Sequence, residues 1–141
     1  MKKIIFTLIF TVSILCSVSS QNLPVLGTIW KENVKSDGKI FVPKYGLIKK
    51  VNFIDNNCLF FAGLDRYSKV VFISTNDEKF KISNIEYIGK SFNNLSGNKK
   101  VNFIVGWANY IPVEEGWFAA SGFRELTDKS TIEFVFKLWE K

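Results

Sequence analysis

The sequence predicts an antiparallel all-β domain of about eight or nine short strands with one short helix near residues 91–96. Three observations support this fold class. Apolar side chains alternate with polar ones in many short runs, turn-forming residues separate the runs, and aromatic residues make up 16% of the chain, 14 of them phenylalanine. Such a pattern is typical of a barrel or of a sandwich of two sheets, and it does not distinguish them.

The N-terminal half contains five of the predicted strands. We expect them at residues 25–30, 39–42, 47–54, 58–63 and 69–74. Asp55, Asn56 and Asn57 join two of these runs, and short Asn/Asp loops favour tight hairpins. Residues 36–38 and 65–68 contain further turn formers. The first half therefore resembles a series of hairpins.

The middle of the chain contains the only helical signal. Residues 80–87 are predicted to form a strand, and Ser91 then offers an N-cap to a turn or two of helix. Phe92 and Leu95 are three residues apart and would share one helix face, and Gly97 can end the helix.

Three strands are predicted in the C-terminal part, at residues 100–113, 117–124 and 131–139. The last, TIEFVFKLW, is the clearest, because Ile132, Phe134, Phe136 and Leu138 fall on one face. This alternation predicts a half-buried strand.

Residues 1–20 have the layout of a signal peptide and are expected to be removed, leaving one β-rich domain at residues 21–141. A basic start precedes an apolar run at residues 4–16 and a small-residue exit at residues 17–20. Thirteen helical residues span about 20 Å, less than the ~30 Å core of a membrane. A lipoprotein anchored through Cys16 is the alternative, which is disfavoured because Ser13 and Leu15 stand in the reverse of the usual order. The expected location is the periplasm or the medium.

Composition excludes several kinds of chemistry. The chain has no histidine, which excludes Ser-His-Asp and Cys-His catalysis and the usual zinc sites. Without the leader, 17 basic residues face 13 acidic ones, a net charge of +4, which is too modest for a nucleic-acid-binding protein. We therefore predict that the protein is not an enzyme and uses no cofactor and no metal.

Cys58 is the only cysteine left after removal of the leader, so no intramolecular disulfide can form. Because Cys58 lies in the apolar run CLFF, we expect a buried, unreactive thiol. A disulfide to a second chain is the alternative.

The hexapeptide KKVNFI occurs twice, at residues 49–54 and 99–104. The flanking residues do not match, and two copies are fewer than a stacked repeat needs. We interpret both copies as strands that begin with a solvated pair of lysines.

The segment at residues 106–123 is the strongest candidate for a binding site. It is predicted to form a long hairpin with its tip at residues 112–116. The predicted partner-binding residues are Tyr110, Glu114, Glu115 and Trp117, because stiff aromatic rings with a polar group suit recognition. Strand parity places Trp107 toward the core and Tyr110 on the opposite face. The alternative is that these rings fill the core.

Residues 71–95, VFISTNDEKFKISNIEYIGKSFNNL, are followed by GWANYIPVEEGW at residues 106–117. This succession resembles a pattern in small exported bacterial all-β proteins of unknown function. In those proteins a strand ends in a Thr-x-Asp turn, Phe-Lys and Ile-Gly precede a short helix, and a Gly-Trp strand pair follows. The resemblance implies an exported β-rich domain and brings no activity with it.

Taken together, these patterns predict an exported, non-enzymatic domain that contacts another envelope or extracellular protein as an inhibitor, an immunity-type protein or an assembly factor. No nucleic acid and no integral membrane segment are expected. The alternative is a small β-barrel that carries an apolar ligand such as a lipid, which the excess of phenylalanine favours. A hydrolase that uses carboxylates alone would need two carboxyl groups about 5 to 9.5 Å apart.

Overall fold

A computed structural model of the chain describes residues 22–31 and 35–140. The predicted leader at residues 1–20, with Cys16, lies outside the described residues. The described elements are β1 (Lys39–Val42), β2 (Gly46–Asp55), β3 (Cys58–Leu64), β4 (Val70–Thr75), β5 (Lys81–Ile82), β6 (Ile85–Glu86), α1 (Phe92–Ser96), β7 (Asn102–Ile104), β8 (Ala108–Pro112), a 3-10 turn (Glu114–Gly116), β9 (Phe118–Gly122) and β10 (Phe134–Leu138).

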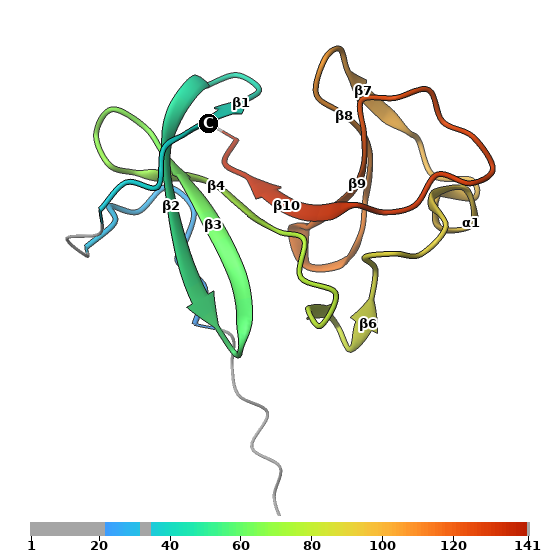
Figure 1. The fold of residues 1–141 in the computed structure, drawn as a ribbon, viewed down its shortest axis with the longest axis horizontal. Helices are drawn as coiled ribbons and strands as arrows, with labels where there is room; N and C mark the ends of the chain where they lie inside the picture. Colours follow the sequence, from blue (N-terminus) through green and yellow to red (C-terminus); the bar gives the residue numbers. More distant parts are fainter. Residues whose placement is uncertain (1–21, 32–34, 141) are drawn as a thin grey trace, which may run out of the picture.

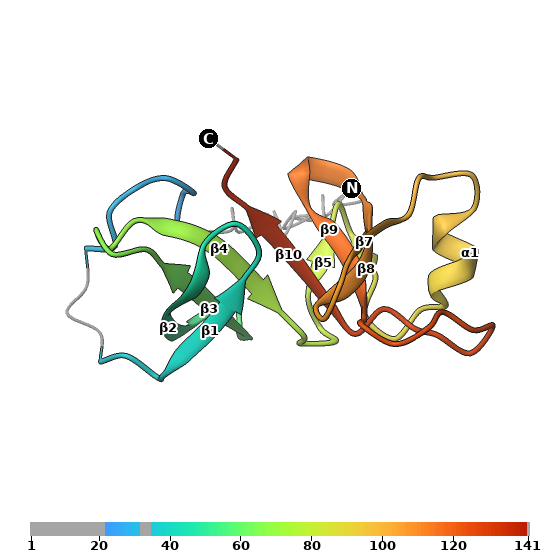
Figure 2. The same ribbon diagram turned by 90° about the horizontal axis from the view of Figure 1, so that it is seen from above.

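The strands form one antiparallel sheet in the order β1-β2-β3-β4-β10-β9-β8-β7 and a separate small hairpin of β5 and β6. Strand β10 runs between the meander β1–β4 and the meander β7–β9 and joins them (Figures 1 and 2). The sheet curls, so that β2 and β3 rise on one side of Figure 1 and β8 and β9 on the other. The all-β prediction is confirmed, and the architecture is an open half-barrel rather than a closed barrel or a sandwich.

A bulge between Gly63 and Leu64 contributes to the curl, because an extra residue in one strand bends it. Gly63 also permits close packing at this point. A Cβ on residue 63 would lie 2.6 Å from Cδ1 of Ile48 on the neighbouring strand β2. A larger residue here would force the Ile48 side chain to move.

The curl gives the sheet two different faces. The outer face, which we call the covered face, packs against the segment at residues 23–30, the β5–β6 hairpin and α1. The inner face, which we call the concave face, gathers a second apolar cluster around Phe72 and Phe136. Both faces are therefore apolar, and this accounts for the large number of phenylalanines.

Most strand predictions in the first half are confirmed to within a residue or two, but residues 25–30 do not form a strand. The amide and hydroxyl of Thr28 donate to the carbonyl of Val25, at 3.2 and 2.6 Å, and close a turn. Gly27 has φ +83°, a left-handed conformation that an extended strand cannot contain. Its pairing with the sheet is limited to one bridge, from Ile29 to Lys69, and to three backbone hydrogen bonds with Ser68 and Val70.

Two predicted strands are instead pairs of short strands. In residues 80–87, Ser83 and Asn84 both have positive φ and form the turn between β5 and β6. In residues 100–113, the turn at Gly106 (φ +73°) separates β7 from β8. The strand parity that placed Trp107 and Tyr110 on opposite faces therefore fails. Both rings lie on the concave face and are in contact, with centroids 6.2 Å apart.

The last strand is shorter than predicted, since it begins at Phe134. Ile132, predicted to share a face with Phe136, packs into the covered-face core instead. The opposite side of the strand is not solvated either, because Val135 is buried. The short helix is confirmed, with the Ser91 side chain accepting a hydrogen bond from the amide of Asn94.

The two copies of KKVNFI have different environments. The first lies wholly in β2, and Val51 is 0% exposed. Only the last three residues of the second copy form a strand, β7 at the sheet edge, and Val101 is 39% exposed. This difference agrees with two independent strands. Among the described residues, no helix has the length and apolar character needed to cross a membrane.

Candidate binding surface

The concave face is floored by an aromatic cluster centred on Phe136 of β10. Five rings have centroids 4.9 to 5.9 Å from its own, and they come from four parts of the chain: Phe72, Trp107, Tyr110, Phe118 and Phe134. Phe72 of β4 also lies 6.2 Å from Trp107, although three strands separate β4 from β7 in the sheet. Only a concave curl brings these two rings together.

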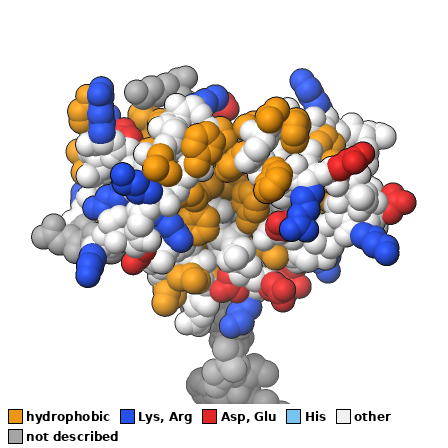
Figure 3. All heavy atoms as spheres, turned by 45° about the horizontal axis from the view of Figure 1, so that its top comes forward, with side chains coloured by type: hydrophobic (Ala, Val, Ile, Leu, Met, Phe, Trp, Pro, Cys, Tyr) orange, Lys and Arg blue, Asp and Glu red, His pale blue; other side chains and the backbone are white. Residues whose placement is uncertain are grey.

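The centre of this cluster is buried but its border is open. Phe72 and Phe136 are buried, whereas Phe61, Trp107, Tyr110, Phe118 and Phe134 are only partly buried. Figure 3, viewed from the open side, shows hydrophobic side chains gathered between the two flanks of the molecule. Within the described part of the chain, the covering segments pack on the other face, so these ring edges reach the surface.

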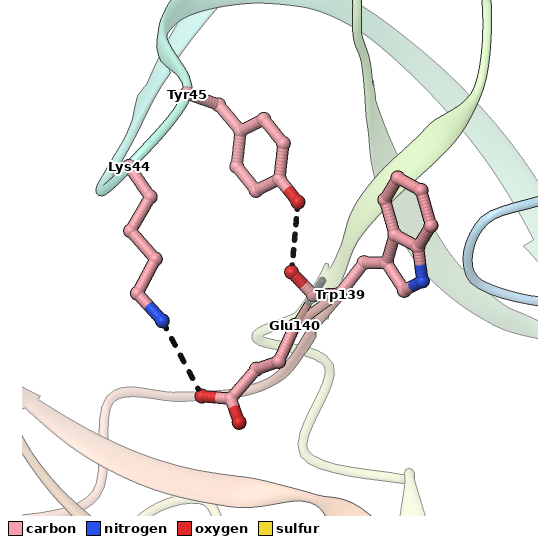
Figure 4. Close-up of polar contacts among 4 residues, drawn as sticks. All are labelled: Lys44, Tyr45, Trp139 and Glu140. Carbon is pink, nitrogen blue, oxygen red and sulfur yellow. Dashed lines mark hydrogen bonds and ion pairs between the residues drawn. The ribbon is translucent and has the colours of Figure 1, made fainter.

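One end of the concave face is closed by contacts between the β1–β2 turn and the residues that follow β10 (Figure 4). The Tyr45 hydroxyl donates to the carbonyl of Trp139 at 2.8 Å, and the Lys44 ammonium lies 3.6 Å from a Glu140 carboxylate oxygen. The ion pair is exposed and contributes little, but the part-buried hydrogen bond of Tyr45 helps to hold the turn in place. Lys50 adds a cation at this rim, 5.1 Å from the centre of the Phe61 ring.

The predicted hairpin at residues 106–123 is present as β8 and β9, joined by the 3-10 turn at Glu114–Gly116. Of the four residues predicted to bind a partner, Tyr110 lies on the concave face with a partly exposed ring. Trp117 is 1% exposed and packs on Phe80 in the covered-face core, with centroids 5.0 Å apart. The tip and the aromatic cluster are therefore separate features.

Both predicted glutamates fasten the hairpin tip to the β5–β6 hairpin. The Tyr87 hydroxyl donates to Glu114, and the Ser83 hydroxyl donates to Glu115 at 2.7 Å. The hydrogen bond from Tyr87 lowers the pKa of the Glu114 carboxyl. Burial, followed by the Glu114 contact, raises the pKa of Tyr87 to about 12. The two shifts agree, since both favour an ionised glutamate beside a neutral tyrosine.

The carboxylates of this region have structural partners. Asp77 accepts hydrogen bonds from the amides of Lys79 and Leu59, at 3.0 and 3.1 Å, and these bonds lower its pKa. Asp77 and Glu114 are therefore held ionised, whereas a general acid needs a raised pKa. Among the described residues, no group of three His, Cys, Asp or Glu side chains is placed to hold a metal ion.

A pocket opens on the covered face and was not anticipated from the sequence. Its volume is about 1020 Å³, and its lining includes Leu26, Ile73, Phe80, Trp117 and Lys137. Lys137 stands over the Trp117 ring, with its nitrogen 5.1 Å from the ring centre. The alternation of the last strand indicates the position of Lys137, because it places Lys137 on the same face as Val135. The pocket itself depends on the tertiary fold, which brings residue 117 beside the last strand.

No protein-family model, curated protein or solved structure matches this chain. The resemblance of residues 71–117 to small exported bacterial proteins stays a prediction. Function is argued below from the geometry of the two faces.

Proposed function

We propose that the protein is a non-enzymatic binding domain that contacts another protein through its concave face. The observation that carries this proposal is the aromatic cluster around Phe136, which has partly exposed rings and no described segment packed over it. Continuous apolar surface is unfavourable in water, and a set of such rings is typical of a binding surface. The domain offers it on a rigid sheet, which limits the entropy lost on binding.

The chemistry of the surface favours a protein as partner. Tyr110 and Trp107 offer large rings with one polar group each, the residue types that are enriched where proteins contact one another. The rim contains Lys44 and Lys50, and the full sequence has a formal net charge of +6. An apolar partner segment bordered by acidic side chains would complement this surface.

The predicted leader at residues 1–20 supports an envelope or extracellular partner, with the protein acting as an inhibitor, an immunity-type protein or an assembly factor. The contact residues differ from those expected at the hairpin tip. Tyr110 remains a proposed contact residue. Phe118 and Trp107 are added, because their rings lie on the same open face. Glu114 and Glu115 keep the hairpin in place instead.

The test is site-specific photo-crosslinking in the producing cell, followed by affinity measurement with the captured protein. A crosslinker at residue 110 or 118 should give one defined product, whereas a crosslinker at Phe103 should not. Phe103 is the matched control because it is an exposed aromatic residue, 55% exposed, outside the cluster.

With the purified pair, Tyr110→Ala should weaken binding by at least tenfold, and Phe103→Ala should leave it unchanged. Circular dichroism and thermal unfolding of each variant would show that the fold is retained. Equal products from residues 103 and 110, or full affinity in Tyr110→Ala, would contradict the proposal.

A further inference from the structure

We propose that the pocket on the covered face binds an amphiphile with one anionic head group, and that Lys137 holds that head group. The pocket lies on the side of the sheet opposite the concave face, so this inference does not rest on the proposed contact with a protein. Carriage of an apolar ligand is the alternative function expected from the sequence, and this proposal names the class of ligand and its site.

The pocket has two kinds of wall. Leu23, Val25 and Leu26 of the N-terminal segment supply the accessible apolar surface, over a floor of Ile73, Phe80 and Trp117, which are themselves almost fully buried. Its volume of about 1020 Å³ is at the upper end of the range for small-molecule sites. An alkyl chain would gain by leaving water for this surface.

Lys137 is placed where an anion would be recognised. Strand pairing puts it beside Ile73 on the covered face, and its ammonium group stacks on Trp117. Burial lowers its pKa, and the charge of Glu115 acts in the opposite direction. In the described part of the chain Lys137 belongs to neither of the ion pairs. An ammonium group that is partly shielded from water and has no carboxylate partner within ion-pair distance gains from an anionic ligand.

The other charged groups in the lining reinforce this preference. Lys79 and Lys81 also line the pocket, against the single carboxylate of Glu115. Glu115 already accepts the hydrogen bond from Ser83, and Lys81 lies 3.1 Å from Glu86. The lining therefore carries more positive than negative charge, which favours a carboxylate or phosphate head and disfavours a cationic one.

The experiment is isothermal titration of the purified protein with decanoate below its micelle concentration. Decyltrimethylammonium has the same chain with the opposite charge, and butyrate has the carboxylate without the chain. The test variant is Lys137→Met, which keeps the unbranched stem over Trp117 and removes the charge. Lys129→Met is the matched control, because Lys129 is an exposed lysine outside the pocket.

We expect decanoate to bind the wild type and Lys129→Met equally, Lys137→Met at least tenfold more weakly, and Lys137→Arg nearly as well as the wild type. Butyrate and decyltrimethylammonium should bind at least tenfold more weakly than decanoate. Equal affinities for decanoate and the cation, or for the wild type and Lys137→Met, would overturn the proposal.

Binding to lipid vesicles distinguishes a free amphiphile from a lipid head group as the source of the anionic ligand. Binding to free decanoate without binding to phosphatidylglycerol vesicles assigns a free amphiphile. Lys137-dependent binding to these vesicles, and not to phosphatidylcholine vesicles, assigns a lipid head group at a membrane surface. Binding to neither decanoate nor anionic vesicles would refute the inference.

A second measurement stands even if Lys137→Met does not fold. Decanoate with a spin label on its chain should broaden the NMR signals of Ile73 and Trp117 more strongly than those of Tyr45 and Phe103, which lie outside the pocket. Broadening on the concave face alone would contradict the pocket. Because the crosslinking test reports on the other face, failure of either proposal leaves the other unaffected.

Discussion

At the scale of single residues, the contact between Tyr87 and Glu114 shows how a predicted binding residue has a structural role. The two residues are 27 positions apart and join the β8–β9 tip to the segment after β6. Tyr87 is buried, so its hydroxyl needs an acceptor, and Glu114 provides it. The glutamate is exposed, so water weakens its contribution.

We predict that Tyr87→Phe lowers the free energy of unfolding by about 1 kcal/mol at pH 7. The folded pKa of Glu114 is below its ordinary value of 4.5, so this contribution is present above that pH and is lost as the pH falls through the folded pKa. The folded pKa of Tyr87 is raised from 10 to about 12, so wild-type stability also falls as the pH rises above 10. The variant lacks the alkaline dependence and shows a weaker acidic one, because a backbone hydrogen bond and the charge of Lys99 still lower the pKa of Glu114.

Urea unfolding at acidic, neutral and alkaline pH would measure these changes. Tyr67→Phe is the control, because Tyr67 is an exposed tyrosine with no such glutamate contact. A Tyr87→Phe protein with the same pH profile as the wild type would show that the contact contributes nothing.

Cys58 is a second case at this scale, and here the sequence was sufficient. It is a free, buried cysteine, as its apolar run predicts. Burial, and then the charge of Asp77, raises the pKa of the thiol, which disfavours the reactive thiolate.

At the scale of elements, turns decide where the strands end. Asn56 and Asn57 both have positive φ, 48° and 62°, and connect β2 to β3 by the tight hairpin that the sequence predicts. Ser83 and Asn84 form a comparable turn, which is hard to predict from the sequence because serine is uncommon at positive φ. The predicted strand at residues 80–87 was therefore wrong.

Substitution at the β2–β3 turn tests this account. Asn57→Ala should lower the free energy of unfolding by about 1 kcal/mol, because alanine tolerates a left-handed conformation poorly. Asn57→Gly should be at least as stable as the wild type, because Asn-Gly is the preferred pair in such turns. Thermal or urea unfolding would measure both, with Asn98→Ala as an exposed control that should change little. An Asn57→Ala variant as stable as the wild type would contradict the prediction.

At the scale of the whole molecule, the curled sheet divides its aromatic residues between two clusters with different roles. The covered-face cluster is closed by the N-terminal segment, the β5–β6 hairpin and α1. The concave-face cluster is held by contacts among its own rings, and Phe136 contacts five of them. It therefore supports the fold and offers a surface at the same time.

Phe136→Ala should accordingly lower the free energy of unfolding by about 3 to 5 kcal/mol, since it removes a buried ring and leaves a cavity. Phe136→Leu, which fills more of the space, should lose less. Phe103→Ala should change stability by no more than about 0.5 kcal/mol, because Phe103 is exposed at the sheet edge. Denaturant unfolding of the three variants would measure this order. Similar losses in Phe136→Ala and Phe103→Ala would mean that the concave cluster does not support the fold.

The candidate surface was only partly predictable for a physical reason. Tyr110 has a partly exposed ring, although the strand parity that singled it out fails, whereas Trp117 looked equivalent in sequence and is buried. Strand parity holds only while a strand is unbroken, and the turn at Gly106 reset the parity between Trp107 and Tyr110. The pocket around Lys137 combines residues from segments that are far apart in the chain, so no local pattern contains it.

The sequence by itself determined the β class, the short helix with its Ser91 cap, the β2–β3 hairpin and the burial of Cys58. Each depends on local periodicity, capping or turn chemistry within a few residues. The tertiary structure alone decided the open half-barrel, the insertion of β10 between two meanders, and which aromatic rings are buried and which are exposed. These features depend on the curl of the whole sheet, which arises from contacts between residues far apart in the chain.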